Sequence, residues 1–121
     1  MPPLKRILVG NVFPIPRIRR SVRIDPMPPE AFPRDAEIVS FWGHADTLPH
    51  ANAFLGVDLS PVSHRPALDL SENLLPTLNG EEFRECWVVS PDYVENFRAA
   101  IGEEIPAEKI RSWTILKITW L

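Results

Sequence analysis

Short apolar runs, separated by proline, glycine and charged residues, dominate the pattern of this 121-residue chain. They are rich in valine, isoleucine and aromatic side chains, which favour β-strands. Six such runs predict strands at residues 5–12, 18–24, 38–42, 67–70, 83–90 and 112–121. The second run alternates, with Ile18, Val22 and Ile24 on one face and arginines on the other, so it predicts a half-buried strand with a basic outer face.

A first helix is predicted between the third and fourth of these strands. Apolar residues recur there at helical spacing, at Leu48, Ala51, Phe54 and Leu55. Asp46 or Thr47 can cap its N-terminus, and Gly56 is placed to end it. The turn before this helix therefore begins at Gly43, directly after a strand.

A second helix is predicted over residues 90–101. Ser90 can act as its N-cap, and Pro91 suits the first helical position. Tyr93, Phe97 and Ile101 then lie on one face, and Gly102 closes the segment.

The elements add up to an α+β fold. We expect a single domain over residues 1–121, with a mixed sheet of about five or six short strands and two main helices. Asn79-Gly80 is the strongest hairpin signal in the chain. The 14 prolines are about twice the ordinary usage of about 5%, so the elements should be short and joined by stiff turns.

Composition indicates the cellular compartment in which the protein is expected. The sequence has no apolar run long enough for a membrane span and no leader pattern, so we expect neither a membrane anchor nor a signal peptide. The single cysteine, Cys86, excludes an internal disulfide and suits a reducing cytoplasm. Its position in mid-strand predicts a buried thiol of the core.

Charge is unevenly distributed along the chain. The first 23 residues hold six basic side chains and no acid, although the net charge is −3. A local basic segment in an acidic protein favours an anionic partner over general nucleic-acid binding. The alternative interpretation, a solvated strand face, stays open.

Candidate chemistry centres on His44. It falls between a strand end and a helix N-terminus, where free backbone N–H groups favour an anion. The imidazole there could bind a phosphate, move a proton or only hydrogen-bond the turn. Trp42, beside this turn, either packs in the core or stacks on a base. The sequence lacks the common phosphate-loop, dinucleotide and metal-binding motifs, so no metal site and no cofactor are expected.

This turn and helix are similar to the signature of the viral ring nuclease family. These are small dimeric α+β proteins that viruses and mobile elements use as type III anti-CRISPRs. In that family a turn of the form Ser-x-x-Gly-His-x-x-Thr opens a helix that ends in Leu-Gly-Val. The matching residues are Ser40, Gly43, His44, Thr47, Leu55, Gly56 and Val57. Arg65 falls near an arginine of the next loop, and Asn11 matches an asparagine after the first strand.

The resemblance implies a concrete activity. The family binds a cyclic tetra-adenylate second messenger across a dimer interface and cuts it without a metal. A ribose 2′-OH attacks the neighbouring phosphate, and His44 would protonate the leaving oxygen as general acid. Backbone N–H groups after Gly43, the Thr47 hydroxyl and Arg65, or an arginine of the first hairpin, would hold the phosphate.

One family segment is not matched. An Arg-Leu-Pro-Glu-Gly-like segment after the penultimate strand carries an arginine and a glutamate. The nearest stretch here, residues 104–108, has an acid in the arginine position and a shifted glutamate. Arg98 is the candidate substitute for the missing cation.

Two classes of function therefore stay open. The first is an enzyme that cleaves cyclic oligoadenylate. The second is a non-catalytic nucleotide-binding or protein-interaction module of a virus or mobile element. In both cases we expect a protein of the host cytoplasm. We also expect a homodimer, because the resemblance implies one and the apolar residues Val12, Phe13 and Trp42 near the turn suit a self-complementary interface.

Overall fold

The computed structural model describes residues 6–42, 48–59, 68–78, 80–94 and 107–121. Five strands form the main sheet in the order β2-β8-β7-β1-β3. Their bounds are β1 Arg6–Gly10, β2 Val22–Pro26, β3 Glu37–Ser40, β7 Glu85–Tyr93 and β8 Ile110–Trp120. β1 runs parallel to β3 and β7, while β8 runs antiparallel to β7 and β2, so the sheet is mixed.

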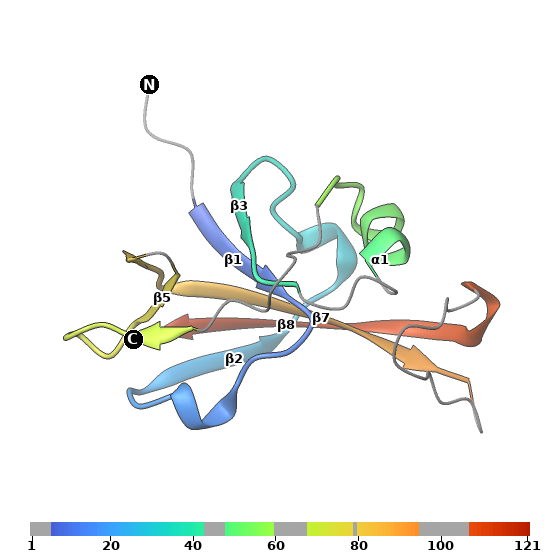
Figure 1. Ribbon diagram of the computed structural model, residues 1–121. Helices are drawn as coiled ribbons and strands as arrows, with labels where there is room; N and C mark the ends of the chain where they lie inside the picture. Colours follow the sequence, from blue (N-terminus) through green and yellow to red (C-terminus); the bar gives the residue numbers. More distant parts are fainter. Residues whose placement is uncertain (1–5, 43–47, 60–67, 79, 95–106) are drawn as a thin grey trace.

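A smaller three-stranded sheet packs against one end of the main sheet (Figure 1). It consists of β4 Asp69–Leu70, β5 Pro76–Leu78 and β6 Glu81–Glu82. β5 and β6 pair antiparallel with Leu78 opposite Glu81, and Gly80 between them has φ +83°. The hairpin predicted from Asn79-Gly80 is therefore confirmed, although Asn79 itself lies outside the described residues.

Helical structure is sparse in the described part of the chain. It consists of α1 Leu48–Leu55 and three short 3₁₀ turns, η1 Ile15–Arg17, η2 Pro29–Ala31 and η3 Ala107–Lys109. Gly56 has φ +72° and its N–H donates to the Asn52 carbonyl, so it ends α1 as predicted. The α+β class is confirmed, and the described residues form eight strands where about five or six were predicted.

The two faces of the main sheet bury separate apolar clusters. On one face, α1 and Phe32 cover Ile7, Val9, Trp87, Val89 and Ile115. On the other, Phe13 and the small sheet cover Leu8, Cys86, Val88, Ile118 and Trp120. Because successive side chains of a strand point to opposite faces of the sheet, the strands contribute apolar residues to both clusters. Cys86 is fully buried, as predicted, and burial raises the pKa of its thiol.

The predicted helix over residues 90–101 is wrong over its first residues. Ser90, Pro91 and Asp92 continue β7, which pairs with β8 as far as Tyr93. The Trp120 N–H donates to the Arg84 carbonyl, so in this part of β7 the even-numbered residues direct their backbone N–H and C=O groups toward β8. The backbone nitrogen of Pro91, which carries no hydrogen, therefore points away from β8. On its other side the pairing with β1 has already ended at Val88, so the proline removes no hydrogen bond from the sheet. The remaining residues of that prediction lie outside the described part.

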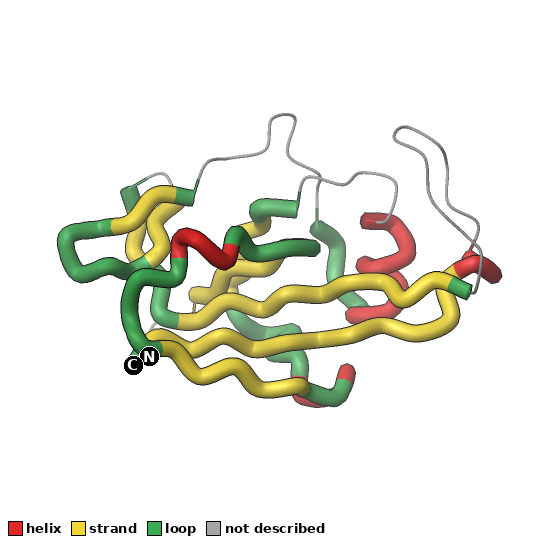
Figure 2. Tube along the Cα trace, turned by 90° about the horizontal axis from the view of Figure 1, so that it is seen from below, coloured by secondary structure: helices red, strands yellow, loops and turns green. Residues whose placement is uncertain are grey.

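The predicted strand at residues 18–24 is shifted toward the C-terminus. β2 begins only at Val22, because the proline-punctuated stretch before it forms η1. Ile24, predicted for the buried face, is 46% exposed since β2 lies at the edge of the sheet. Figure 2 shows the neighbouring β7–β8 hairpin extending past the shorter strands. None of the helices among the described residues has the length and apolar character needed to span a membrane.

Candidate functional site

The candidate site lies where the parallel strands β1 and β3 end. Ser40 is the last residue of β3 and pairs with Val9, while Asn11 follows β1 directly. The Phe41 N–H donates to the Val9 carbonyl at 2.9 Å and carries the pairing one residue further. The predicted turn at 43–47 then leads into α1. Carboxyl ends of parallel strands that precede a helix are a common place for ligands.

Ser40 hydrogen-bonds the backbone directly after β3. Its Oγ accepts a hydrogen bond from the Trp42 N–H at 3.2 Å, a local bond from side chain to backbone. The Ser40 hydroxyl hydrogen is not used by that bond. Trp42 is fully buried in the cluster beneath α1, so the core interpretation is confirmed and stacking on a base is wrong for this residue.

Gly10 allows Phe41 to fold back over β1. A Cβ atom at Gly10 would lie 2.4 Å from the Phe41 ring, well inside contact distance. Phe41 is 3% exposed and packs edge-on against Phe13, so its ring has little room to move. The glycine, interpreted from sequence as a strand end or bulge, is thus the place where two segments of the site approach each other.

Asn11 connects the site to β7. Its backbone carbonyl accepts a hydrogen bond from the Ser90 hydroxyl at 2.9 Å. Both residues line a groove of about 220 Å³, whose other walls are apolar. The remaining lining residues are Val12, Phe13, Ile15, Ile24, Val88, Leu116 and Ile118. Sequence reasoning missed Ser90 as a site residue because it was assigned to a helix cap.

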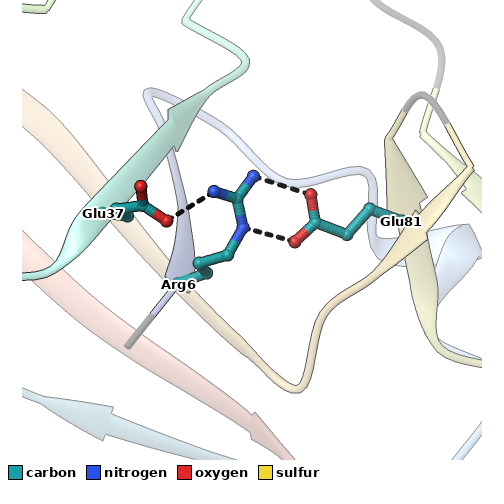
Figure 3. A network of polar contacts seen from close by, with 3 residues as sticks. All are labelled: Arg6, Glu37 and Glu81. Atoms are coloured by element: carbon teal, nitrogen blue, oxygen red, sulfur yellow. Dashed lines mark hydrogen bonds and ion pairs between the residues drawn. The ribbon is translucent and has the colours of Figure 1, made fainter. Parts of the chain in front are cut away.

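Three arginines of the basic N-terminal segment, Arg6, Arg20 and Arg23, have protein partners. Arg6 lies at the opposite end of β1 from Asn11 and binds Glu37 and Glu81 at 2.6 Å each (Figure 3). These hydrogen bonds raise the pKa of Arg6 and lower that of Glu81. Arg20 donates to the carbonyls of Leu121 and Asn73.

Arg23 completes this pattern, since it pairs with Asp25. Arg6 and Arg20 therefore connect segments that are far apart in the sequence, whereas the Arg23 pair is local to β2. The groove beside Asn11 has no charged residue among its described walls.

Several predicted site residues fall outside the described part of the chain. They are Gly43, His44, Thr47, Arg65 and Arg98. The structure brings Asn11 and Ser40 to the ends of neighbouring strands. Within the described residues, no group of three histidine, cysteine or acidic side chains is arranged to hold a metal ion.

The residues first chosen for a dimer interface are mostly unsuitable. Phe13 is 5% exposed and Trp42 is fully buried, so both are used within the chain itself. Val12, at 41% exposed, is available to a partner. The prediction that Phe13 and Trp42 form a dimer interface is therefore wrong, because each ring packs in an apolar cluster, one on each face of the main sheet.

Comparison with known proteins extends the fold assignment. No protein-family model matches the chain, and no curated protein matches it in sequence. Among solved structures, the chain is similar to B116 of Sulfolobus turreted icosahedral virus, with a TM-score of 0.60. The match covers 96% of this chain and 99% of that one at 15% identity. The two proteins share a fold, and the chain thus has the fold of a viral protein.

Proposed function

We propose that the protein binds a cyclic oligoadenylate second messenger at the carboxyl ends of β1 and β3 and cleaves it without a metal. The observation that carries the proposal is the position of the ring-nuclease-like signature. Its described residues lie at the end of β3 and along and just after α1, and β3 pairs with the strand that leads to Asn11. Residues 43–47 of the signature lie outside the described part of the chain. The similar solved structure is a viral protein, which is compatible with a viral origin. The proposed role against type III CRISPR signalling in the cytoplasm of a host cell rests on the resemblance of the signature.

The proposed reaction is an internal transesterification. A ribose 2′-oxygen attacks the adjacent phosphorus and forms a 2′,3′-cyclic phosphate, while the bond from phosphorus to the 5′-oxygen breaks. His44 donates its proton to that leaving oxygen, and the 2′-OH proton passes to water. Backbone N–H groups of the turn before α1 hold the phosphate oxygens, and the Thr47 hydroxyl and Arg65 or Arg98 assist.

Nucleotide binding without turnover is the second candidate. Two observations favour it: the family's arginine–glutamate pair has no clear match, and the described groove walls carry no cation. Arg6 and Arg20 do not supply one, because both are held by protein partners. A protein of this kind would sequester the messenger instead of destroying it.

One assay separates these candidates. Cyclic tetra-adenylate is incubated with the protein and a chelator, and the products are resolved by chromatography. His44→Ala should lower the rate about 10²–10⁴-fold, the usual contribution of a general acid. It should change binding less than about tenfold, because the proton transfer stabilises the transition state.

His50→Ala is the matched control, since His50 lies on α1 and no role is assigned to it. Binding without linear product in the wild type would move the protein to the sequestering class. The absence of both binding and cleavage would refute the proposal and leave a shared fold only.

A further inference from the structure

Ser90 lies on β7 beyond the point where that strand stops pairing with β1. The pairing with β1 ends at Val88, whereas the pairing with β8 continues to Tyr93, and Figure 2 shows this hairpin extending past the shorter strands. Ser90 pairs with Thr114 of β8, and Pro91 restricts the backbone directly after it. The Ser90 side chain therefore projects from a backbone that the β7–β8 ladder holds in place.

The Asn11 carbonyl points in a direction that a continued β1 strand would not give it. The Val9 carbonyl accepts the Phe41 N–H, so the backbone groups of Val9 face β3. Residues two positions apart in a strand direct their backbone groups to the same neighbour, so a longer β1 would direct Asn11 toward β3 as well. Instead, the Asn11 carbonyl accepts the Ser90 hydroxyl of β7 at 2.9 Å. The chain therefore turns away from β3 directly after Gly10.

This change of direction places Asn11 at the border of the apolar groove beside the candidate site. Asn11 and Ser90 both line the groove, which measures about 220 Å³. Within the described part of the chain, no hydrogen bond joins the Asn11 side-chain amide to another residue. A carboxamide can donate two hydrogen bonds and also accept them. The Asn11 amide is therefore available to a bound ligand.

We propose that Ser90 is a positioning residue that acts through Asn11 and holds the Asn11 amide toward the bound messenger. This inference rests on the proposed function, in which the messenger binds at the carboxyl ends of β1 and β3. The Ser90 hydroxyl proton is already used by the Asn11 carbonyl, so Ser90 acts without donating to the ligand. A binding group that is fixed before the ligand arrives loses less conformational entropy on binding.

Removal of the Ser90 hydroxyl should weaken binding and leave the chemical step intact. Ser90→Ala should raise the Kd for cyclic tetra-adenylate about tenfold, the change expected for one lost hydrogen bond. The Kd is measured by calorimetry in the His44→Ala background, where turnover is slow. With His44 present, Ser90→Ala should raise KM and keep kcat within about threefold, whereas His44→Ala alone should lower kcat. Ser90→Thr keeps a hydroxyl and should recover most of the affinity.

A double-mutant cycle with Asn11 tests whether Ser90 acts by this route. Asn11→Ala removes the amide but keeps the backbone carbonyl that Ser90 binds. If Ser90 acts through the amide, Ser90→Ala should cost no further affinity in the Asn11→Ala background, although it costs about tenfold alone. Losses that add in the double variant overturn the inference, because Ser90 would then act on binding independently of the Asn11 side chain.

Ser112→Ala is the matched control. It removes a serine hydroxyl from the same hairpin, where Ser112 donates to Asp92 at 3.1 Å and has no assigned role in the site. Urea unfolding measures the stability of each variant, and Ser112→Ala should leave the Kd unchanged. Wild-type affinity in Ser90→Ala, or an equal loss in Ser112→Ala, overturns this inference and leaves the proposed function standing. A wild type that does not bind cyclic tetra-adenylate overturns both.

Discussion

Gly10→Ala tests the tight contact that connects the two strands of the candidate site. The new Cβ would lie 2.4, 2.5 and 2.7 Å from three atoms of the Phe41 ring. Gly10 does not have a positive φ, so alanine meets no backbone strain and the perturbation is steric. The ring must move, although it is 3% exposed and packs against Phe13.

The magnitude follows from overpacking of a buried cluster. Such insertions typically cost about 1–3 kcal/mol, which for a chain of this size lowers Tm by about 4–12 °C. Urea unfolding of the wild type and variant measures the change in the free energy of unfolding. Phe41→Leu in the Gly10→Ala background removes ring atoms at the clash and should recover part of the loss.

Gly80→Ala gives the matched control. Gly80 has φ +83° and nothing within 4 Å of its Cβ position, so alanine there costs backbone strain without a clash. Phe41→Leu should not rescue that variant. The reasoning is refuted if Gly10→Ala changes stability by less than about 0.5 kcal/mol, or if Phe41→Leu affects both glycine variants equally.

Three further predictions concern stability and access. Arg6 lowers the pKa of Glu81, so this pair stabilises the fold above the ordinary glutamate pKa of 4.5 and loses its effect as pH falls below it; Arg6→Met should flatten the acid limb of a Tm–pH profile. Cys86 should react with a thiol reagent only on unfolding, at a rate that follows urea concentration, because its thiol is buried and its pKa is raised. Ser90→Ala removes the hydrogen bond to the Asn11 carbonyl and should cost about 0.5–1.5 kcal/mol in urea unfolding, whereas Ser90→Thr should retain part of it.

The strands were largely predictable because their apolar runs are short and flanked by breakers. Strands occur in all six predicted segments, and Gly56 and Gly80 have the positive φ values that end a helix and turn a hairpin. The predicted helix start at Ser90 is wrong for a physical reason. Ser-Pro-Asp is a helix-start signal locally, but pairing with β8 decided the conformation of these residues.

For the candidate site, the sequence predicted where two residues lie relative to the strands but not their contacts. Asn11 and Ser40 were expected near the turn, and they lie at the ends of paired parallel strands. Sequence could not show that Trp42 turns fully into the core, because its neighbour Phe41 packs on the other face of the sheet. Nor could it show that Ser90 meets Asn11, a contact between residues 79 positions apart.

The most direct test of the central claim is an NMR titration of ¹⁵N-labelled protein with cyclic tetra-adenylate in the presence of a chelator. We predict that the largest amide shifts occur at Asn11, Ser40 and Ser90, around the carboxyl ends of β1 and β3. Amides near Arg6 and Glu81, at the opposite end of β1, should change little. Saturating shifts centred on that opposite end, or no shifts at any ligand concentration, would contradict the claim.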